Sequence, residues 1–192
     1  MLIDALQFLS RTVLDLFATA FFLRFWMQWA RVPFHNPFAQ FIVKVTDFAV
    51  RPVRRVVPGL FGMDWASLLL MFSAAILSVL IVQWLSGFPF GVAGIDVLPG
   101  FLLMGIAGAL RLALYILMGL VILQAVMSWV NPHSPFAPVF YALARPILAP
   151  FQRWIPPIGG VDVSPIVCLL AMQLILVAPV AALERAAMSW AM

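Results

Sequence analysis

The sequence is short of charged residues and of cysteine, and each shortage excludes classes of protein. Only 9% of the 192 residues are charged and 65% are hydrophobic, whereas about 25% of a soluble domain is charged. Such a chain needs lipid as its solvent, which excludes an ordinary soluble globular protein. The lone cysteine, Cys168, can form neither an intramolecular disulfide nor a thiolate metal cluster, and we expect a small buried side chain.

The chain also lacks the residue patterns on which most enzymes depend. It shows no paired nucleophile and base, no metal-ligand cluster and no glycine-rich phosphate loop ahead of a helix. We therefore expect no enzymatic activity, no catalytic residue, no metal and no cofactor. The net charge of +4 is small and scattered, which argues against direct nucleic-acid binding. The N-terminus, MLID, is acidic where a signal peptide is basic, so we expect no cleavable signal.

Four long apolar stretches dominate what the sequence does contain, and each reaches the roughly 20 residues needed to cross a bilayer. They cover residues 5–29, 65–86, 101–130 and 163–183. The fold class predicted is an all-α membrane protein with four transmembrane helices. Lysine and arginine gather in the first and third connections and are missing from the middle one. This bias predicts that the first and third connections face the cytoplasm and that both termini lie outside it.

The stretch from His35 to Asp64 occurs twice, which indicates a tandem duplication. Shifted by 98 residues, it aligns without a gap on the stretch from His133 to Asp162, and nine of its 30 positions are identical. The predicted units are residues 1–86 and 101–192, joined by a linker at 87–100 that is rich in glycine and proline. Each unit is expected to form a helix, a proline-rich interfacial segment and a second helix.

Each duplicated stretch is expected to begin with a short helix. Asn36 and Ser134 precede prolines, which is typical of a helix N-cap followed by proline in the first turn. Pro52 and Pro146 are expected to end these helices after about 10 to 14 residues. Helices of this length are too short to span a bilayer, so they would lie in the interface or re-enter the membrane under a protein cover.

The end of each duplicated stretch carries a repeated arginine and a repeated aspartate. Asp64 and Asp162 directly precede apolar runs and are expected to cap the next helices. We predict salt bridges from Arg55 to Asp64 and from Arg153 to Asp162 that brace each turn. The alternative for these four residues is a paired binding site for an anion or a lipid headgroup.

The repeated histidines are the only other pair with ligand chemistry. His35 and His133 could hold a metal or a haem axially if the two repeats face each other. No further histidine and no CxxCH motif supports a ligand, so we expect interfacial side chains beside a helix cap.

Charges inside the apolar stretches are candidates for function, because such charges are costly in a membrane. Arg11 and Asp15 are four residues apart and can pair on one face of the first helix. Arg111 stands alone in the third stretch, and we predict that Asp15, or else Asp4, pairs with it across the repeats. The pair would set the register of the helices, or it would line a polar pathway for ions.

Two motifs carry a resemblance to a known family. Residues 128–136 read SWVNPHSPF and residues 153–165 read RWIPPIGGVDVSP, while the first unit carries RPVRRVVPG at residues 51–59. In this pattern an apolar helix ends near SW and a proline-rich turn leads to a helix start with aspartate. It resembles the YggT family, also called YlmG, of bacterial and plastid membrane proteins. The first unit departs from the pattern where Trp65-Ala66-Ser67 replaces the Ser-Pro element.

The resemblance implies a multi-pass protein of the bacterial inner membrane. It also links relatives to osmotic or ionic stress tolerance, to cell division and chromosome distribution, and in plastids to haem attachment. Three functions of different classes follow: a non-enzymatic scaffold or assembly factor, a small ion channel or transport-associated protein, and a haem-handling assembly factor. The expected partners are membrane lipids, further copies of the chain or other membrane proteins.

Overall fold

The computed structural model describes residues 1–59, 62–131, 136–156 and 162–191, and its regular elements there are all helices. Four helical segments are long and apolar enough to cross a membrane, as the sequence predicts: Leu2–Trp29, Trp65–Leu85, Leu98–Ser128 and Ser164–Trp190. The first two are α1 (Leu2–Trp29) and α3 (Trp65–Leu85), and the third lies within α5 (Leu98–Val130). The fourth combines α7 (Ser164–Ile175), the π-helical turn η1 (Leu176–Val180) and α8 (Ala181–Ala191).

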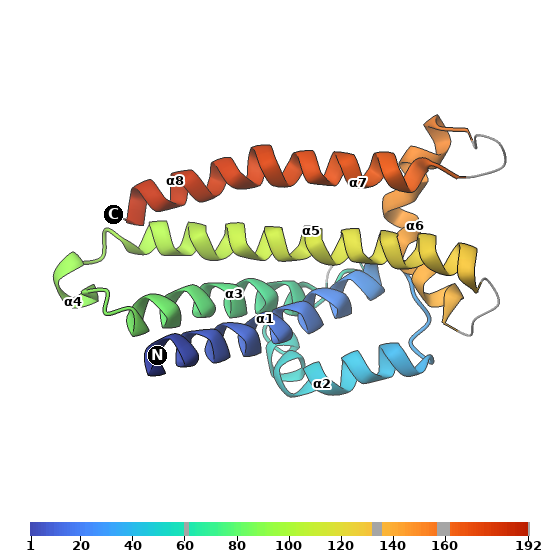
Figure 1. Cartoon of the computed structure of the whole chain (residues 1–192). Helices are drawn as coiled ribbons and strands as arrows, with labels where there is room; N and C mark the ends of the chain where they lie inside the picture. The colour runs from blue at the N-terminus through green and yellow to red at the C-terminus, as the bar shows by residue number, and fades with distance from the viewer. Residues whose placement is uncertain (60–61, 132–135, 157–161, 192) are drawn as a thin grey trace.

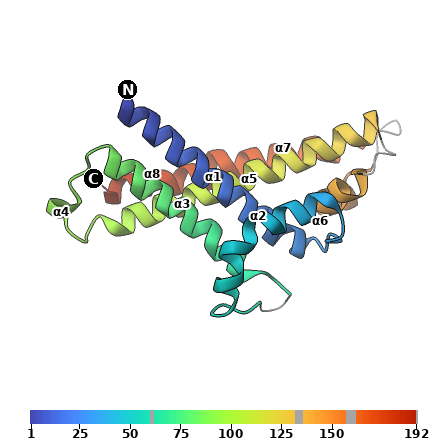
Figure 2. The same cartoon turned by 90° about the horizontal axis from the view of Figure 1, so that it is seen from below.

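The long helices pack in the order α1, α3, α5 and α8, so each helix mainly contacts its neighbour in this series. Both termini and the short helix α4 (Phe90–Ala93) lie at one end of the molecule (Figure 1). Towards the other end lie two shorter helices, α2 (Pro37–Arg54) and α6 (Ala137–Trp154). Helix α6 runs across the ends of α5 and α7, whereas α2 doubles back beside α1 (Figures 1 and 2).

Helices α2 and α6 each contain 18 residues, so the predicted helix ends at Pro52 and Pro146 are wrong. Both prolines lie inside their helices, as does Pro150. A proline removes one backbone hydrogen bond from a helix, yet both helices continue and pack on their neighbours, α2 on α1 and α3, and α6 on α5 and α7. The start of α2 is as expected, because the Asn36 side chain accepts a hydrogen bond of 2.8 Å from the Ala39 N–H.

The contact between α3 and α5 depends on a glycine. A Cβ atom placed on Gly105 would lie 2.6 Å from the Cα atom of Ile76, which no real side chain tolerates. The two backbones therefore approach each other at this point more closely than any other residue permits. Ala109, one turn further along α5, is fully buried in the same core.

The fourth membrane helix contains a wide turn and is longer than predicted. Pro179 lies within the π-helical turn, and the helix then continues to Ala191, beyond the predicted end at residue 183. Proline has no N–H to donate, and a single π-type turn inside an α-helix is a common way to accommodate this. Helix α5 likewise starts at Leu98, inside the predicted linker at 87–100.

Candidate functional site

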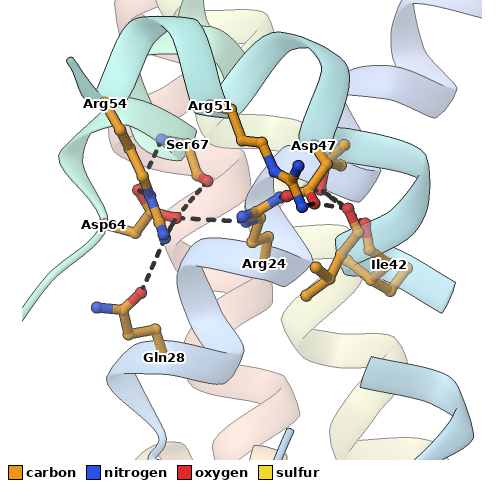
Figure 3. Close-up of polar contacts among 10 residues, drawn as sticks. Arg24, Gln28, Ile42, Asp47, Arg51, Arg54, Asp64 and Ser67 are labelled. Carbon is orange, nitrogen blue, oxygen red and sulfur yellow. Dashed lines mark hydrogen bonds and ion pairs between the residues drawn. The ribbon is translucent and has the colours of Figure 1, made fainter. Parts of the chain in front are cut away.

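A buried arginine on α1 organises the polar contacts at the α2 end of the molecule. Arg24 is only 5% exposed, although it lies in a membrane-spanning helix. One terminal nitrogen, Nη1, donates to Thr46 Oγ1 at 2.8 Å, to the Asp47 carboxylate at 2.9 Å and to the Val43 carbonyl at 3.3 Å (Figure 3). A single guanidinium thus holds α2 against α1 by three bonds. Arg51 completes the contact by pairing with Asp47 at 2.7 Å.

Asp64 is the second centre of this network, and it is 1% exposed. Its carboxylate accepts hydrogen bonds from Arg54 Nη2 at 2.5 Å and from Arg54 Nε at 3.2 Å. It also accepts from the Ser67 hydroxyl at 2.6 Å and the Ser67 N–H at 3.3 Å, so it caps α3 as predicted. Arg24 Nε lies 3.6 Å from the same carboxylate, and the three helices α1, α2 and α3 therefore meet at one buried charge (Figure 3).

The arginine that braces Asp64 is Arg54, so the predicted salt bridge from Arg55 to Asp64 is wrong. Arg55 is exposed, and the structure gives it no contact with Asp64. Because α2 stays helical as far as Arg54, successive side chains point about 100° apart, and only residue 54 faces α3. With the helix expected to end at Pro52, the sequence could not show which of the two arginines faces Asp64.

The same correction applies at the second predicted salt bridge. Asp162 accepts a hydrogen bond from Gln152 Nε2 at 2.8 Å and from the Ser164 N–H at 2.9 Å, whereas Arg153 is exposed. Arg54 and Gln152 are 98 residues apart, and so are Asp64 and Asp162. Both polar bonds thus join positions that the sequence alignment of the two units makes equivalent, although only the first carries two charges. The duplication itself stays a prediction.

The buried contacts change the acidity of two carboxylates outside the membrane-spanning segments. Burial raises the pKa of Asp64, but hydrogen bonds from Arg54 and Ser67 and the charge of Arg54 outweigh it, so the pKa falls below its ordinary value. Burial raises the pKa of Asp47 as well, but hydrogen bonds and charges from Arg24 and Arg51 outweigh it, so this pKa is also lowered. Both groups are therefore anions at neutral pH, which matches the arginines around them.

The other short helix, α6, is bound to α1 through an indole. Trp26 Nε1 donates a hydrogen bond of 2.9 Å to the Leu143 carbonyl, and both residues are buried. The rings of Phe38 on α2 and Phe140 on α6 lie 6.0 Å apart, so the two short helices also meet each other. Sequence analysis did not identify Arg24 or Trp26 as central residues. The available signal was a charge within an apolar helix, close to its end.

A second polar cluster lies within the membrane-spanning segments. Arg11 Nε is 3.7 Å from the Asp15 carboxylate, which is the contact expected from their spacing. Arg111 forms an ion pair with Glu184 on α8, so the predicted pairing of Arg111 with Asp15 or Asp4 is wrong. The extra length of the fourth helix carries Glu184 to this level, beyond where the sequence placed its end. All four side chains nevertheless line one cavity of about 420 Å³, whereas Asp4 pairs with the N-terminal amine.

Only one of the two predicted histidine ligands lies among the described residues. His35 is exposed in the connection between α1 and α2, and its carbonyl accepts a hydrogen bond of 3.1 Å from Gln40. His133 lies outside the described residues. Within the described part of the chain, no three His, Cys, Asp or Glu side chains gather as a metal site.

These features together define a class: a multi-pass α-helical membrane protein with one polar network at an end of the helices and another inside the membrane. Comparison with known families then gives the family. The family model described as CCB3/YggT matches residues 3–85 and 103–183, and the chain belongs to this family.

Relatives from several bacteria agree with this assignment. The protein YggT of Escherichia coli K12 is 35% identical over 173 residues, which cover 90% of this chain and 87% of that protein. A Vibrio alginolyticus protein named for the proC 3' region is 33% identical, covering 88% and 90% of the two chains. The Pseudomonas aeruginosa protein PA0392 is 34% identical, covering 88% and 84%. No solved structure matches the chain.

Proposed function

We propose that this protein is a non-enzymatic scaffold or assembly factor of the bacterial inner membrane. It would engage its partners through α2 and α6, which face the cytoplasm, with both termini on the other side. One observation carries the proposal: both short helices are fixed to α1 by buried polar bonds. Arg24 holds α2 and Trp26 holds α6. Helices held in this way present their outer surfaces in a fixed orientation, which is what an assembly platform requires.

The outer surface of α2 has the composition expected of a contact surface at a membrane interface. Phe41 and Phe48 are 62% and 66% exposed, and they alternate with exposed Lys44 and Arg51 along one side of the helix. Aromatic rings suit the boundary between headgroups and acyl chains, and cations suit anionic headgroups. On α6, Tyr141 and Arg145 are exposed in the same manner.

The proposal accounts for the partners and settings expected from the sequence. Anionic lipids, other membrane proteins and further copies of the chain can all contact a surface of rings and cations, whereas no direct nucleic-acid binding is proposed. The two duplicated units would each contribute one such helix. Tolerance of osmotic stress and cell division are processes in which such a platform would act.

Co-purification tests the proposal directly. The tagged protein would be extracted in native lipid nanodiscs, and its associated proteins and lipids quantified by mass spectrometry. The double variant Lys44→Glu/Arg55→Glu reverses the charge of the α2 surface without touching Arg24 or Asp64. We expect the amount of each specific partner that co-purifies with this variant to fall at least tenfold, since electrostatic complementarity selects partners at such surfaces.

Arg185→Glu is the matched control, because it makes the same kind of charge change on exposed α8, near the other end of the molecule. It should retain the partners of the parent protein. An identical set of partners in the parent and in both variants would contradict the scaffold proposal.

Transport is the second candidate function, and the charged cavity within the membrane favours it. Its test is ion flux into liposomes that contain the purified protein. Sustained, selective flux that is lost in Asp15→Asn would replace the scaffold by a transport function. The absence of flux above that of empty liposomes would eliminate the alternative.

A further inference from the structure

The cavity in the membrane-spanning region is lined by helices from both halves of the chain. Helices α1, α3, α5 and α8 contribute its walls, and its volume is about 420 Å³. Pockets for small ligands are commonly in the range of about 300 to 1,000 Å³. Arg11 and Asp15 from α1 stand on one wall, and Arg111 from α5 with Glu184 from α8 stand on another.

The charges that line the cavity are balanced, and most of their side chains remain partly exposed. Two cations and two anions give the lining a net charge of zero. Arg11 contacts the Asp15 carboxylate at 3.7 Å, yet its side chain is 72% exposed and that of Asp15 is 45% exposed. The Arg111 side chain is 45% exposed beside its partner Glu184. Charged groups that remain accessible at membrane depth normally face water or a ligand, because lipid cannot solvate them.

From this arrangement we infer that the cavity binds a small zwitterion, a molecule with one cationic and one anionic group. The cationic group would lie between the carboxylates of Asp15 and Glu184, and the anionic group between the guanidiniums of Arg11 and Arg111. A ligand without net charge keeps the lining neutral, whereas a single ion would leave one charge uncompensated in a medium of low dielectric.

The remaining lining suits the uncharged part of such a ligand. Ser78 and Tyr115, which carry hydroxyl groups, are among the lining residues, as are Met104 and Met188 with their flexible apolar side chains. Methionine adapts to ligands of different shape. The site therefore fits a polar head with a short aliphatic body, and it is too small for a whole lipid. The inference does not rest on the scaffold function.

Binding to the intact protein tests the inference. The protein would be placed in nanodiscs of phosphatidylglycerol, whose headgroup is not a zwitterion, and studied by equilibrium dialysis with radiolabelled glycine betaine, L-proline and taurine. Acetate and tetramethylammonium serve as the separate halves of a zwitterion. We expect saturable binding of at least one zwitterion, and at least tenfold weaker binding of both halves, since each half adds one uncompensated charge to a neutral lining.

The source of the zwitterion is distinguished by a second lipid. Nanodiscs that contain phosphatidylethanolamine present a zwitterion, made of an ammonium and a phosphate group, on a lipid. Competition by this lipid would assign the site to a headgroup that enters between the helices, and no competition would assign it to a free solute. Saturable binding in either case supports the inference, and no saturable binding of any of the three probes overturns it.

Variants separate ligand binding from helix bracing. Asp15→Asn should weaken binding at least tenfold. The Asp15 side chain is 45% exposed, so we expect this variant to fold, and elution as a single species checks that first. The exchange Arg111→Glu with Glu184→Arg restores the pair between α5 and α8 but reverses the polarity of that wall. We expect parental thermal stability and at least tenfold weaker binding; parental affinity in this exchange, or in Asp15→Asn, would overturn the inference.

Discussion

Trp26 and Leu143 are 117 residues apart, and a hydrogen bond of 2.9 Å from the indole N–H to the peptide carbonyl joins them. The bond links the first membrane helix to the short helix of the second half. Because it uses a backbone carbonyl, it fixes the path of α6 whatever side chain stands at residue 143. Together with Arg24, it makes α1 the helix to which both short helices are attached.

Replacement of this tryptophan by phenylalanine removes the donor and keeps most of the ring. For Trp26→Phe we expect a loss of about 1 to 3 kcal/mol in the free energy of unfolding, because the buried Leu143 carbonyl loses its partner. Trp29→Phe is the matched control, since Trp29 is 48% exposed and lies on the same helix. Unfolding in detergent, followed by circular dichroism, measures both. Equal effects of the two substitutions would contradict the role given to the hydrogen bond.

Removal of Arg24 should be the most damaging single change at the α2 end. Arg24→Leu leaves Asp47 and Asp64 with one cation fewer in a buried position, and breaking a buried ion pair costs about 3 to 5 kcal/mol. The control is Arg55→Gln, whose exposed side chain should change stability by no more than about 0.5 kcal/mol. Arg54→Gln should be clearly worse than Arg55→Gln in the same unfolding measurement. The reverse order would show that the brace runs through Arg55 after all.

The lowered pKa of Asp64 predicts a specific dependence of stability on pH. Its folded pKa lies below its unfolded value, so the unfolded chain binds more protons over that interval and stability rises with pH there. The contribution is complete above the ordinary carboxyl pKa of about 4 and is lost as the pH falls through the folded pKa.

Thermal unfolding between pH 7 and pH 3 measures this dependence. The parent protein should lose more stability on acidification than Asp64→Asn, and Arg54→Gln should fall between them because it removes one cause of the lowered pKa. Parallel losses in the parent and Asp64→Asn would show that Asp64 does not carry the effect.

The glycine contact between α3 and α5 gives the simplest steric test. Gly105→Ala should destabilise the protein by about 1 to 3 kcal/mol, because its Cβ meets the Ile76 backbone and the helices must separate. Gly108→Ala lies one turn away, and a Cβ there meets nothing within 4 Å. That control should be neutral or slightly stabilising, since alanine favours helices over glycine. If both variants unfold alike, the close approach is not needed for stability.

The sequence predicts the elements of this protein better than their contacts. Long apolar runs locate the membrane helices, and the Asn36 and Asp64 caps follow from the residue type and the spacing alone. Both predicted salt bridges failed by one residue, because the expected helix ends at Pro52 and Pro146 were too early. Helical phase determines which of two neighbouring side chains faces a partner, and an error in helix length changes that phase.

Contacts between distant helices could not be predicted from the sequence, for a different reason. The partner of Arg111 is Glu184, which stands on a helix that continues past its expected end. Arg24 could be recognised as a costly charge in an apolar helix, but its partners Asp47 and Asp64 depend on how α2 folds back. Tertiary packing determines which residues pair, and these pairings cannot be read from a single sequence.

The wide turn at Leu176–Val180 has a mechanical consequence for the fourth helix. Segment α7 packs against α6 and α5, whereas α8 packs mainly against α5. The turn fixes how far α8 is rotated about the helix axis relative to α7. Deleting one residue there would turn α8 by about 100° and carry Glu184 away from Arg111. The geometry of the intramembrane charges is thus determined by a turn that contains no charge.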